Sequence, residues 1–160
     1  MIQEPISLQN ELQQRRPFGS RGQEAVIALL RTADLLRRHL SQASEPHGIT
    51  VQQYNVLRIL RGAGPQGLAC RGIGERLISH DPDITRLLDR MEKRGLITRE
   101  RQKDDRRVVK TRITPQGIEL IKPLDQPMRD LHKRQFRHVP ATRLKILSGI
   151  LEEIRAREQE

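Results

Sequence analysis

The sequence is poor in cysteine and in aromatic side chains. Its 160 residues include one cysteine, Cys70, no tryptophan, one tyrosine and two phenylalanines. A single thiol excludes an intramolecular disulfide framework and is too few for a cysteine-based metal cluster. Single-stranded nucleic acids are bound largely by stacking their bases on aromatic rings, so the shortage of aromatics favours duplex nucleic acid over single strands.

Patterns that carry catalysis or metal binding are also missing. The five histidines follow no metal-ligand spacing, and the glycine-rich stretches 62–67 and 72–74 lack the lysine or strand context of a phosphate-binding loop. There is no nucleophile elbow and no HExxH helix. The sequence therefore predicts neither an enzyme nor a metal or cofactor site.

Long apolar runs are absent as well. No segment approaches the about 18 consecutive apolar residues that a membrane-spanning helix needs. Residues 1–16 are polar and contain no apolar signal core. We therefore expect a cytoplasmic protein without a membrane partner.

Basic residues dominate the charge. Thirty Lys and Arg against twenty Asp and Glu give a formal net charge of +10, which favours a polyanionic partner: nucleic acid first, an acidic membrane second. The segment 82–112 holds eleven Lys or Arg and six Asp or Glu, and so carries half of the net charge in about a fifth of the chain. The positive charge is therefore localised.

Helical periodicity predicts a mainly α-helical chain. Residues 1–20 lack it and are expected to form an arm that is mobile or wrapped on a partner. Two segments carry an apolar stripe, about 23–44 and about 141–157. The second stripe holds more apolar surface than a lone terminal helix easily hides. The stripes comprise Val26, Leu29, Leu30, Ala33, Leu36 and Leu40, and Leu144, Leu147, Ile150, Leu151 and Ile154.

Between these helices the sequence predicts a helix-turn-helix. Thr50 and Gln53 have the spacing of a capping box at the start of one helix. Residues 68–78 follow as the first helix of the motif, in which Gly72 and Gly74 each cost about 1 kcal/mol relative to alanine. Asp81 is suited to cap the second helix, over 82–94, with Pro82 as its first residue.

A hairpin and a divided helix are predicted next. Segments 97–101 and 108–113 alternate in the manner of strands and flank a charged tip at 102–107. Thr114 and Pro115 then resemble a cap and a helix start. Pro123 and Pro127 are expected to kink or divide the helix that follows.

The helix over 82–94 has an outer face with the chemistry for reading DNA. Once its apolar residues turn inward, the residues left outside are Thr85, Arg86, Asp89, Arg90 and Lys93; with Asp83 at the helix start they form the predicted DNA-binding set. The planar fork of arginine matches guanine O6 and N7, so Arg86 and Arg90 are expected to contact bases. The alternative is a solvated basic helix with ordinary surface ion pairs.

The hairpin tip offers a second contact. Arg106 or Arg107 is suited to enter the narrower minor groove, whose negative potential attracts a guanidinium, and Asp105 is suited to hold the arginine by a bidentate pair. A soluble turn without a DNA role explains the same residues equally well.

Several of these segments together resemble the MarR family of winged-helix regulators. The likeness runs from Thr50 to Gly117 and rests on Gln-Tyr-Asn-Val-Leu-Arg at 53–58, the run 81–97, Asp-Arg-Arg-Val at 105–108 and Ile-Thr-Pro-Gln-Gly at 113–117. It implies that 82–94 is the recognition helix and that the wing carries an Asp-x-Arg signature at Asp105 and Arg107. It also implies that the terminal helices interlock into a homodimer.

The resemblance supplies a complete set of expectations. The fold is mainly α with a small β-hairpin wing: an arm over 1–20, a dimerisation helix over 21–48, a winged helix-turn-helix lobe over 49–114 and dimerisation helices over 115–160. The function is a repressor that binds a pseudo-palindromic operator in duplex DNA. The family's cleft for a small phenolic or aromatic effector would be lined by Arg38, His39, Tyr54 and Arg58, although Tyr54 suits the core equally.

Two other classes remain open. One is a winged-helix module that docks onto protein or RNA and uses its basic face for general charge attraction. The other is an enzyme or ligand carrier built on the dimer cleft, for which the sequence offers no nucleophile or base.

Overall fold

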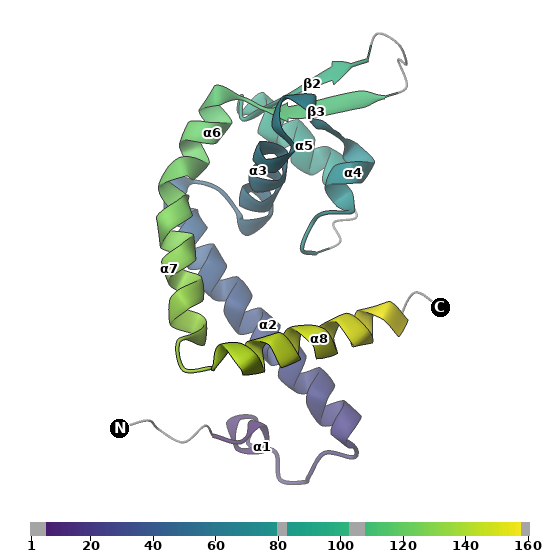
Figure 1. Ribbon diagram of the computed structural model, residues 1–160, viewed down its shortest axis with the longest axis vertical. Helices are drawn as coiled ribbons and strands as arrows, with labels where there is room; N and C mark the ends of the chain where they lie inside the picture. The colour runs from purple at the N-terminus through teal and green to yellow at the C-terminus, as the bar shows by residue number, and fades with distance from the viewer. Residues whose placement is uncertain (1–5, 80–82, 103–107, 158–160) are drawn as a thin grey trace.

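The computed structural model describes residues 6–79, 83–102 and 108–157. It is mainly helical and has one small antiparallel sheet, as the sequence predicts. The sheet and the helices next to it in sequence gather at one end in a lobe, and long helices extend away from this lobe (Figure 1). The helices are α1 (Leu8–Glu11), α2 (Arg21–Ser44), α3 (Val51–Ala63), α4 (Cys70–Gly74), α5 (Ile84–Lys93), α6 (Pro115–Ile121), α7 (Asp125–Phe136) and α8 (Ala141–Arg157), and the strands are β1 (Leu68–Ala69), β2 (Ile97–Arg101) and β3 (Val109–Ile113).

The first long helix, α2, begins two residues earlier than the apolar stripe suggests. The Ser20 hydroxyl accepts a hydrogen bond from the Gln23 N–H at 3.1 Å and so caps the helix start. The helix ends at Ser44, as predicted. The preceding arm holds the four-residue helix α1, which the sequence does not predict, and Glu11 of this helix pairs with Arg31 of α2 at 2.5 Å.

Helix α3 starts with the predicted capping box. The Thr50 hydroxyl accepts from the Gln53 N–H, and the Gln53 side chain accepts from the Thr50 N–H. These bonds satisfy two backbone donors that a helix N-terminus otherwise leaves open. Val56, Leu57 and Leu60 lie on one face of α3, are completely buried and belong to the core of the lobe.

The segment 68–78 differs from its prediction as one helix. Leu68 and Ala69 form the short strand β1, paired with Thr111 and Lys110 of β3, and helix α4 covers only Cys70–Gly74. Gly67 explains the strand: its φ is 61°, and a Cβ there would come within 2.5 Å of the Thr111 carbonyl oxygen. Only a glycine lets the chain approach β3 so closely.

The sheet therefore has three strands, in the order β1-β3-β2, where two were predicted. The hairpin of β2 and β3 pairs Ile97 with Ile113 and Arg101 with Val109. Gly95 leads into it from α5 with φ 68°, the left-handed conformation expected of the residue that ends a helix.

Helix α5 is shorter than the predicted span 82–94. It runs from Ile84 to Lys93, with Asp83 at the N-cap position. The predicted cap Asp81 and first residue Pro82 lie outside the described residues. Leu87, Leu88 and Met91 are buried against the lobe, so the inward face is the one that the periodicity indicates.

After the sheet, Thr114 caps α6 through a 3.0 Å bond from the Gly117 N–H, with Pro115 as first helical residue. The chain then passes through a 3₁₀ turn at Lys122–Leu124 into α7, so Pro123 divides the predicted helix, as expected. Pro127 lies in the first turn of α7, where a missing N–H costs no hydrogen bond. Helix α8 has the predicted bounds.

One apolar core joins these elements. It lies where α3, α5, the hairpin and the start of α7 meet, and its fully buried members include Leu57, Leu60, Leu87, Leu88, Met91, Ile97, Ile121 and Leu124. Among the described residues, no helix is long and apolar enough to cross a membrane.

Among the described glycines, Gly117 of α6 leaves the least space for a Cβ atom. A Cβ at this position would collide with the Leu96 carbonyl oxygen and meet Ile113 Cγ1 at 2.9 Å. We expect Gly117→Ala to lower the free energy of unfolding by about 1–3 kcal/mol, because a backbone carbonyl cannot move aside cheaply. Gly62→Ala is the control: nothing lies near its Cβ position, so the helix should gain up to about 1 kcal/mol. Urea unfolding monitored by circular dichroism measures both, and equal effects would contradict the steric argument.

Candidate nucleic-acid interface

The outer face of α5 presents the predicted basic side chains. Thr85, Arg86, Arg90 and Lys93 are exposed, while Leu87, Leu88 and Met91 on the opposite side are buried. Packing of the apolar stripe therefore determines which side chains face solvent. The structure brings these four predicted residues together on one exposed helix face.

Arg86 is paired within its own helix. Its Nη1 lies 3.1 Å from the Asp83 carboxylate, in a geometry where 82% of the Arg86 side chain is exposed. An ion pair so exposed contributes at most about 1 kcal/mol. Arg86 can therefore exchange Asp83 for another acceptor at low cost.

Among the described residues, Asp89, unlike Arg86 and Arg90, is paired with a side chain of the hairpin. Its carboxylate lies 2.5 Å from Nη2 of Arg99 on strand β2, and the same guanidinium reaches Glu92 of α5 at 2.7 Å. The hydrogen bond from Arg99 to Glu92 raises the pKa of the guanidinium, with the bond to Asp89 adding to the effect. Asp89 is half-buried, and it belongs to a cluster between helix and strand that the sequence analysis did not foresee.

The described part of the hairpin adds further basic residues. Arg101 is exposed, whereas Arg112 donates to the Pro65 carbonyl and pairs with Glu100, both at 2.8 Å. Arg112 therefore stabilises the lobe internally. The predicted wing residues Asp105, Arg106 and Arg107 lie outside the described residues.

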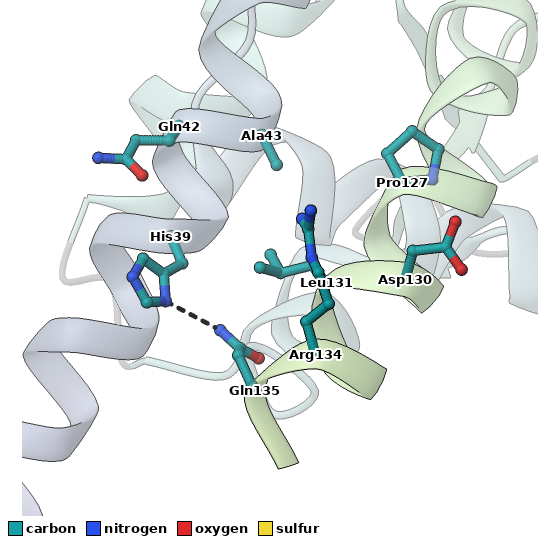
Figure 2. A pocket seen from close by; sticks show the side chains of 8 residues that line it. All are labelled: His39, Gln42, Ala43, Pro127, Asp130, Leu131, Arg134 and Gln135. Atoms are coloured by element: carbon teal, nitrogen blue, oxygen red, sulfur yellow. Dashed lines mark hydrogen bonds between the residues drawn. The ribbon is translucent and has the colours of Figure 1, made fainter. Parts of the chain in front are cut away.

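A pocket of about 640 Å³ opens between α2 and α7. Figure 2 shows His39 of α2 facing Gln135 of α7, with His39 Nδ1 3.4 Å from the Gln135 amide nitrogen. Ala43, Pro127 and Leu131 supply apolar surface, and Asp130 and Arg134 supply charge. The pocket has the size and mixed lining of a small-molecule site.

Only one of the four predicted effector residues lines this pocket. His39 does so, whereas Arg38 pairs with Asp34 on the exposed side of α2. Tyr54 packs against the core, and Arg58 donates to the Asn55 amide oxygen at 3.1 Å. Sequence reasoning missed Gln42 and Ala43 of α2 and every lining residue from α7. On α7, Pro127, Asp130, Leu131 and Arg134 recur at steps of three and four. That spacing marks one helix face.

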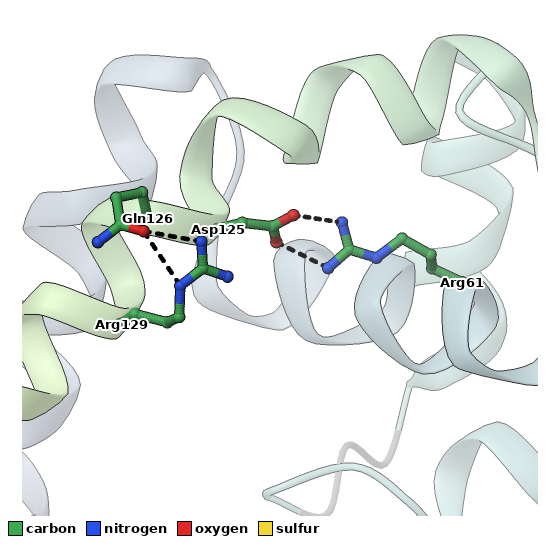
Figure 3. Close-up of polar contacts among 4 residues, drawn as sticks. All are labelled: Arg61, Asp125, Gln126 and Arg129. Carbon is green, nitrogen blue, oxygen red and sulfur yellow. Dashed lines mark hydrogen bonds and ion pairs between the residues drawn. The ribbon is translucent and has the colours of Figure 1, made fainter.

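Helix α7 is tied to the lobe by a bidentate ion pair. Arg61 of α3 donates to both carboxylate oxygens of Asp125, the first residue of α7, at 3.0 and 2.7 Å (Figure 3). The Arg61 hydrogen bonds hold the pKa of Asp125 below its ordinary value of 3.8. Burial, and then the charge of Asp125, raises the pKa of the nearby Tyr54 phenol. The described residues include no cluster suited to a metal ion.

Comparison with known proteins identifies the family. The family model described as "MarR family" matches residues 49–109, which span α3 to the start of β3. The solved structure of a MarR transcription factor from Planctomyces limnophilus is 40% identical, covers 85% of this chain and 98% of its own, and superposes with a TM-score of 0.63. The chain belongs to the MarR family. Its members are transcription regulators and not enzymes, in agreement with the sequence analysis.

Two further relatives come from bacteria. The HTH-type transcriptional regulator MhqR of Bacillus subtilis is 30% identical over 59% of this chain and 64% of its own. This chain spans 53% and 64% of the length of the first two curated relatives that it matches, of which MhqR is the second. CouR from Rhodococcus jostii RHA1, solved bound to p-coumaroyl-CoA, is 26% identical, covers 86% of this chain and 95% of its own, and has a TM-score of 0.72.

The Asp125 pair should make stability depend on pH. Because folding lowers the pKa of Asp125, its stabilising effect is present above pH 4 and is lost as the pH falls through the lowered value. We expect Asp125→Asn to cost on the order of 1 kcal/mol at pH 7. The difference from wild type in urea unfolding should shrink as the pH falls below 4. A pH-independent deficit in Asp125→Asn would refute the assignment.

Proposed function

We propose that two copies of this chain bind a pseudo-palindromic operator in duplex DNA and repress transcription. The observation that carries the proposal is the exposed basic face of α5. Thr85, Arg86, Arg90 and Lys93 project from a helix whose opposite side is fixed in the core. Among the described residues, Arg90 and Lys93 have no ion-pair partner.

The proposed division of labour follows from the side-chain chemistry. Arg86 and Arg90 contact base edges in the major groove, where the guanidinium fork matches guanine. Thr85 contacts a thymine methyl or a phosphate, Lys93 contacts a phosphate, and Asp83 orients Arg86. Arg106 or Arg107, held by Asp105, enters the adjacent minor groove from the wing.

The dimer is proposed from apolar surface that the single chain leaves open. Val26 and Leu30 of α2 are 56% and 66% exposed, and α8 exposes Ile146, Leu147, Ile150 and Ile154. Such stripes on two helices outside the lobe suit a second copy of the chain. Two recognition helices then meet successive major grooves, about 34–36 Å apart.

Release by a small aromatic effector completes the proposal. The pocket between α2 and α7 supports it, as does the relative CouR, which was solved with p-coumaroyl-CoA. His39 lines the pocket, and Arg38, Tyr54 and Arg58 remain predicted members of the effector site. An effector that binds one dimer geometry better than the other shifts the population away from DNA binding.

A gel-shift comparison of genomic fragments tests operator recognition. We expect one fragment to survive competitor DNA and its affinity to fall steeply with salt, because each neutralised phosphate releases counterions. Arg90→Ala should cost about 1–3 kcal/mol and relax preference at one base pair. Arg137→Ala, which removes the same charge from the far end of α7, should leave the preference intact. Equal affinity for every duplex would support a general charge-driven module instead.

Helix α8 provides the test of the dimer. Ile150→Glu places a charge in the exposed apolar stripe and should convert the dimer to monomer at micromolar concentration, because a buried unpaired charge costs several kcal/mol. Ser148→Glu, on the other side of the same helix, should leave the dimer intact. Sedimentation equilibrium measures both variants, and a monomeric wild type would overturn the proposal.

A further inference from the structure

The contact between α5 and the hairpin is made by one arginine and two carboxylates. Arg99 lies on β2, and Asp89 and Glu92 lie one helical turn apart on α5. The guanidinium meets Asp89 at 2.5 Å through Nη2 and Glu92 at 2.8 Å through Nε. A single planar group therefore joins two points of the helix to one point of the strand. We call these three residues the helix–wing clamp.

The main chain takes part as well. The Arg99 N–H donates to the second Glu92 oxygen at 3.1 Å. Strand β2 is at the edge of the sheet, so this bond satisfies a backbone donor that β3 does not use. Glu92 thus holds the position of the strand itself, and the clamp does not depend on a side chain alone.

The clamp is partly shielded from water. Only 25% of the Arg99 side chain is exposed, whereas 82% of the Arg86 side chain on the outer face of α5 is exposed. Charged hydrogen bonds are stronger and better defined where water is excluded. Water therefore screens the bonds of Arg99 less than the pair of Arg86 and Asp83.

Charge also separates Asp89 from the residues proposed to read DNA. A bare carboxylate on a recognition helix repels phosphates, and in the major groove it can accept hydrogen bonds only from base amino groups such as that of cytosine. Pairing with Arg99 neutralises that repulsion and engages the Asp89 oxygen nearest the wing. Arg90, its neighbour in sequence, has no such partner among the described residues.

From this geometry we infer that Asp89, Glu92 and Arg99 are positioning residues that hold the recognition helix and the wing at one fixed angle. Asp89 acts through Arg99 and not on a base. The clamp keeps α5 and the wing at a fixed relative position, so that both can contact the operator at the same time. Residues that touch no DNA therefore set part of the specificity for the operator. This inference rests on the proposed function.

The test compares Asp89→Asn, Arg99→Lys and their double variant with wild type. Each is titrated with the fragment that wild type selects from genomic DNA and with a scrambled duplex of the same length. We expect both single variants to lower the ratio of specific to non-specific affinity about tenfold, with the salt slope unchanged, since no phosphate contact is lost. The double variant should be no worse than either single variant, because all three break the same contact.

A matched control separates the clamp from a general effect of hairpin ion pairs. Glu100→Gln removes a carboxylate from β2 that pairs with Arg112 inside the hairpin and not with α5. It should leave the affinity ratio within about twofold of wild type. Thermal melting checks that each variant is folded. If Arg99→Lys does not fold, Glu92→Gln takes its place in the comparison.

The outcomes are distinct. A change of preference at one base pair in Asp89→Asn, with Arg99→Lys unaffected, would mean that Asp89 reads a base and would overturn the inference. Unchanged ratios in both variants would overturn it too. A wild-type protein that does not discriminate between the two duplexes would instead refute the proposed function, and the clamp's role in specificity would fall with it.

Discussion

Burial of one face of helix α5 in the core of the lobe is the constraint on which the rest of this structure depends. Leu87, Leu88 and Met91 are almost completely buried in the core that also holds Val56, Leu57 and Leu60, so the helix can neither roll nor slide without opening that core. Cores are packed densely enough that such a movement would leave cavities costing several kcal/mol. The basic face is held outward by burial of the opposite face, and the hairpin is fixed next to it because Ile97 enters the same core.

The basic side chains of the lobe fall into two groups: some bridge separate elements, and others remain exposed to solvent. Arg61, Arg99 and Arg112 bridge separate elements: α3 to α7, β2 to α5 and β3 to the segment before β1. Arg90, Lys93 and Arg101 carry the same charge but remain exposed. A net charge of +10 therefore overstates the charge available to a partner. Helix α5 and the adjoining hairpin are one of several places where cations reach solvent; Arg21 and Arg71, for example, are exposed on other elements.

Helix α7 connects the two halves of the molecule. Its first residue is tied to the lobe through Arg61, while its middle turns face α2 across the pocket (Figures 2 and 3). The same helix therefore contacts both the lobe and the pocket.

The sequence by itself determined the features that depend on neighbours in the chain. The capping box at Thr50, the cap at Thr114, the left-handed Gly95 and the division at Pro123 are all local, so residue type and spacing predicted them correctly. The inward faces of α3 and α5 followed from periodicity for the same reason. Only the tertiary structure decided the rest. Strand β1 forms because Gly67 admits a close approach to β3, a contact 44 residues away in the chain. Likewise, Asp89 is drawn to Arg99, and His39 meets Gln135, because packing brings separate elements together; no local pattern encodes which of several similar charges will find a partner.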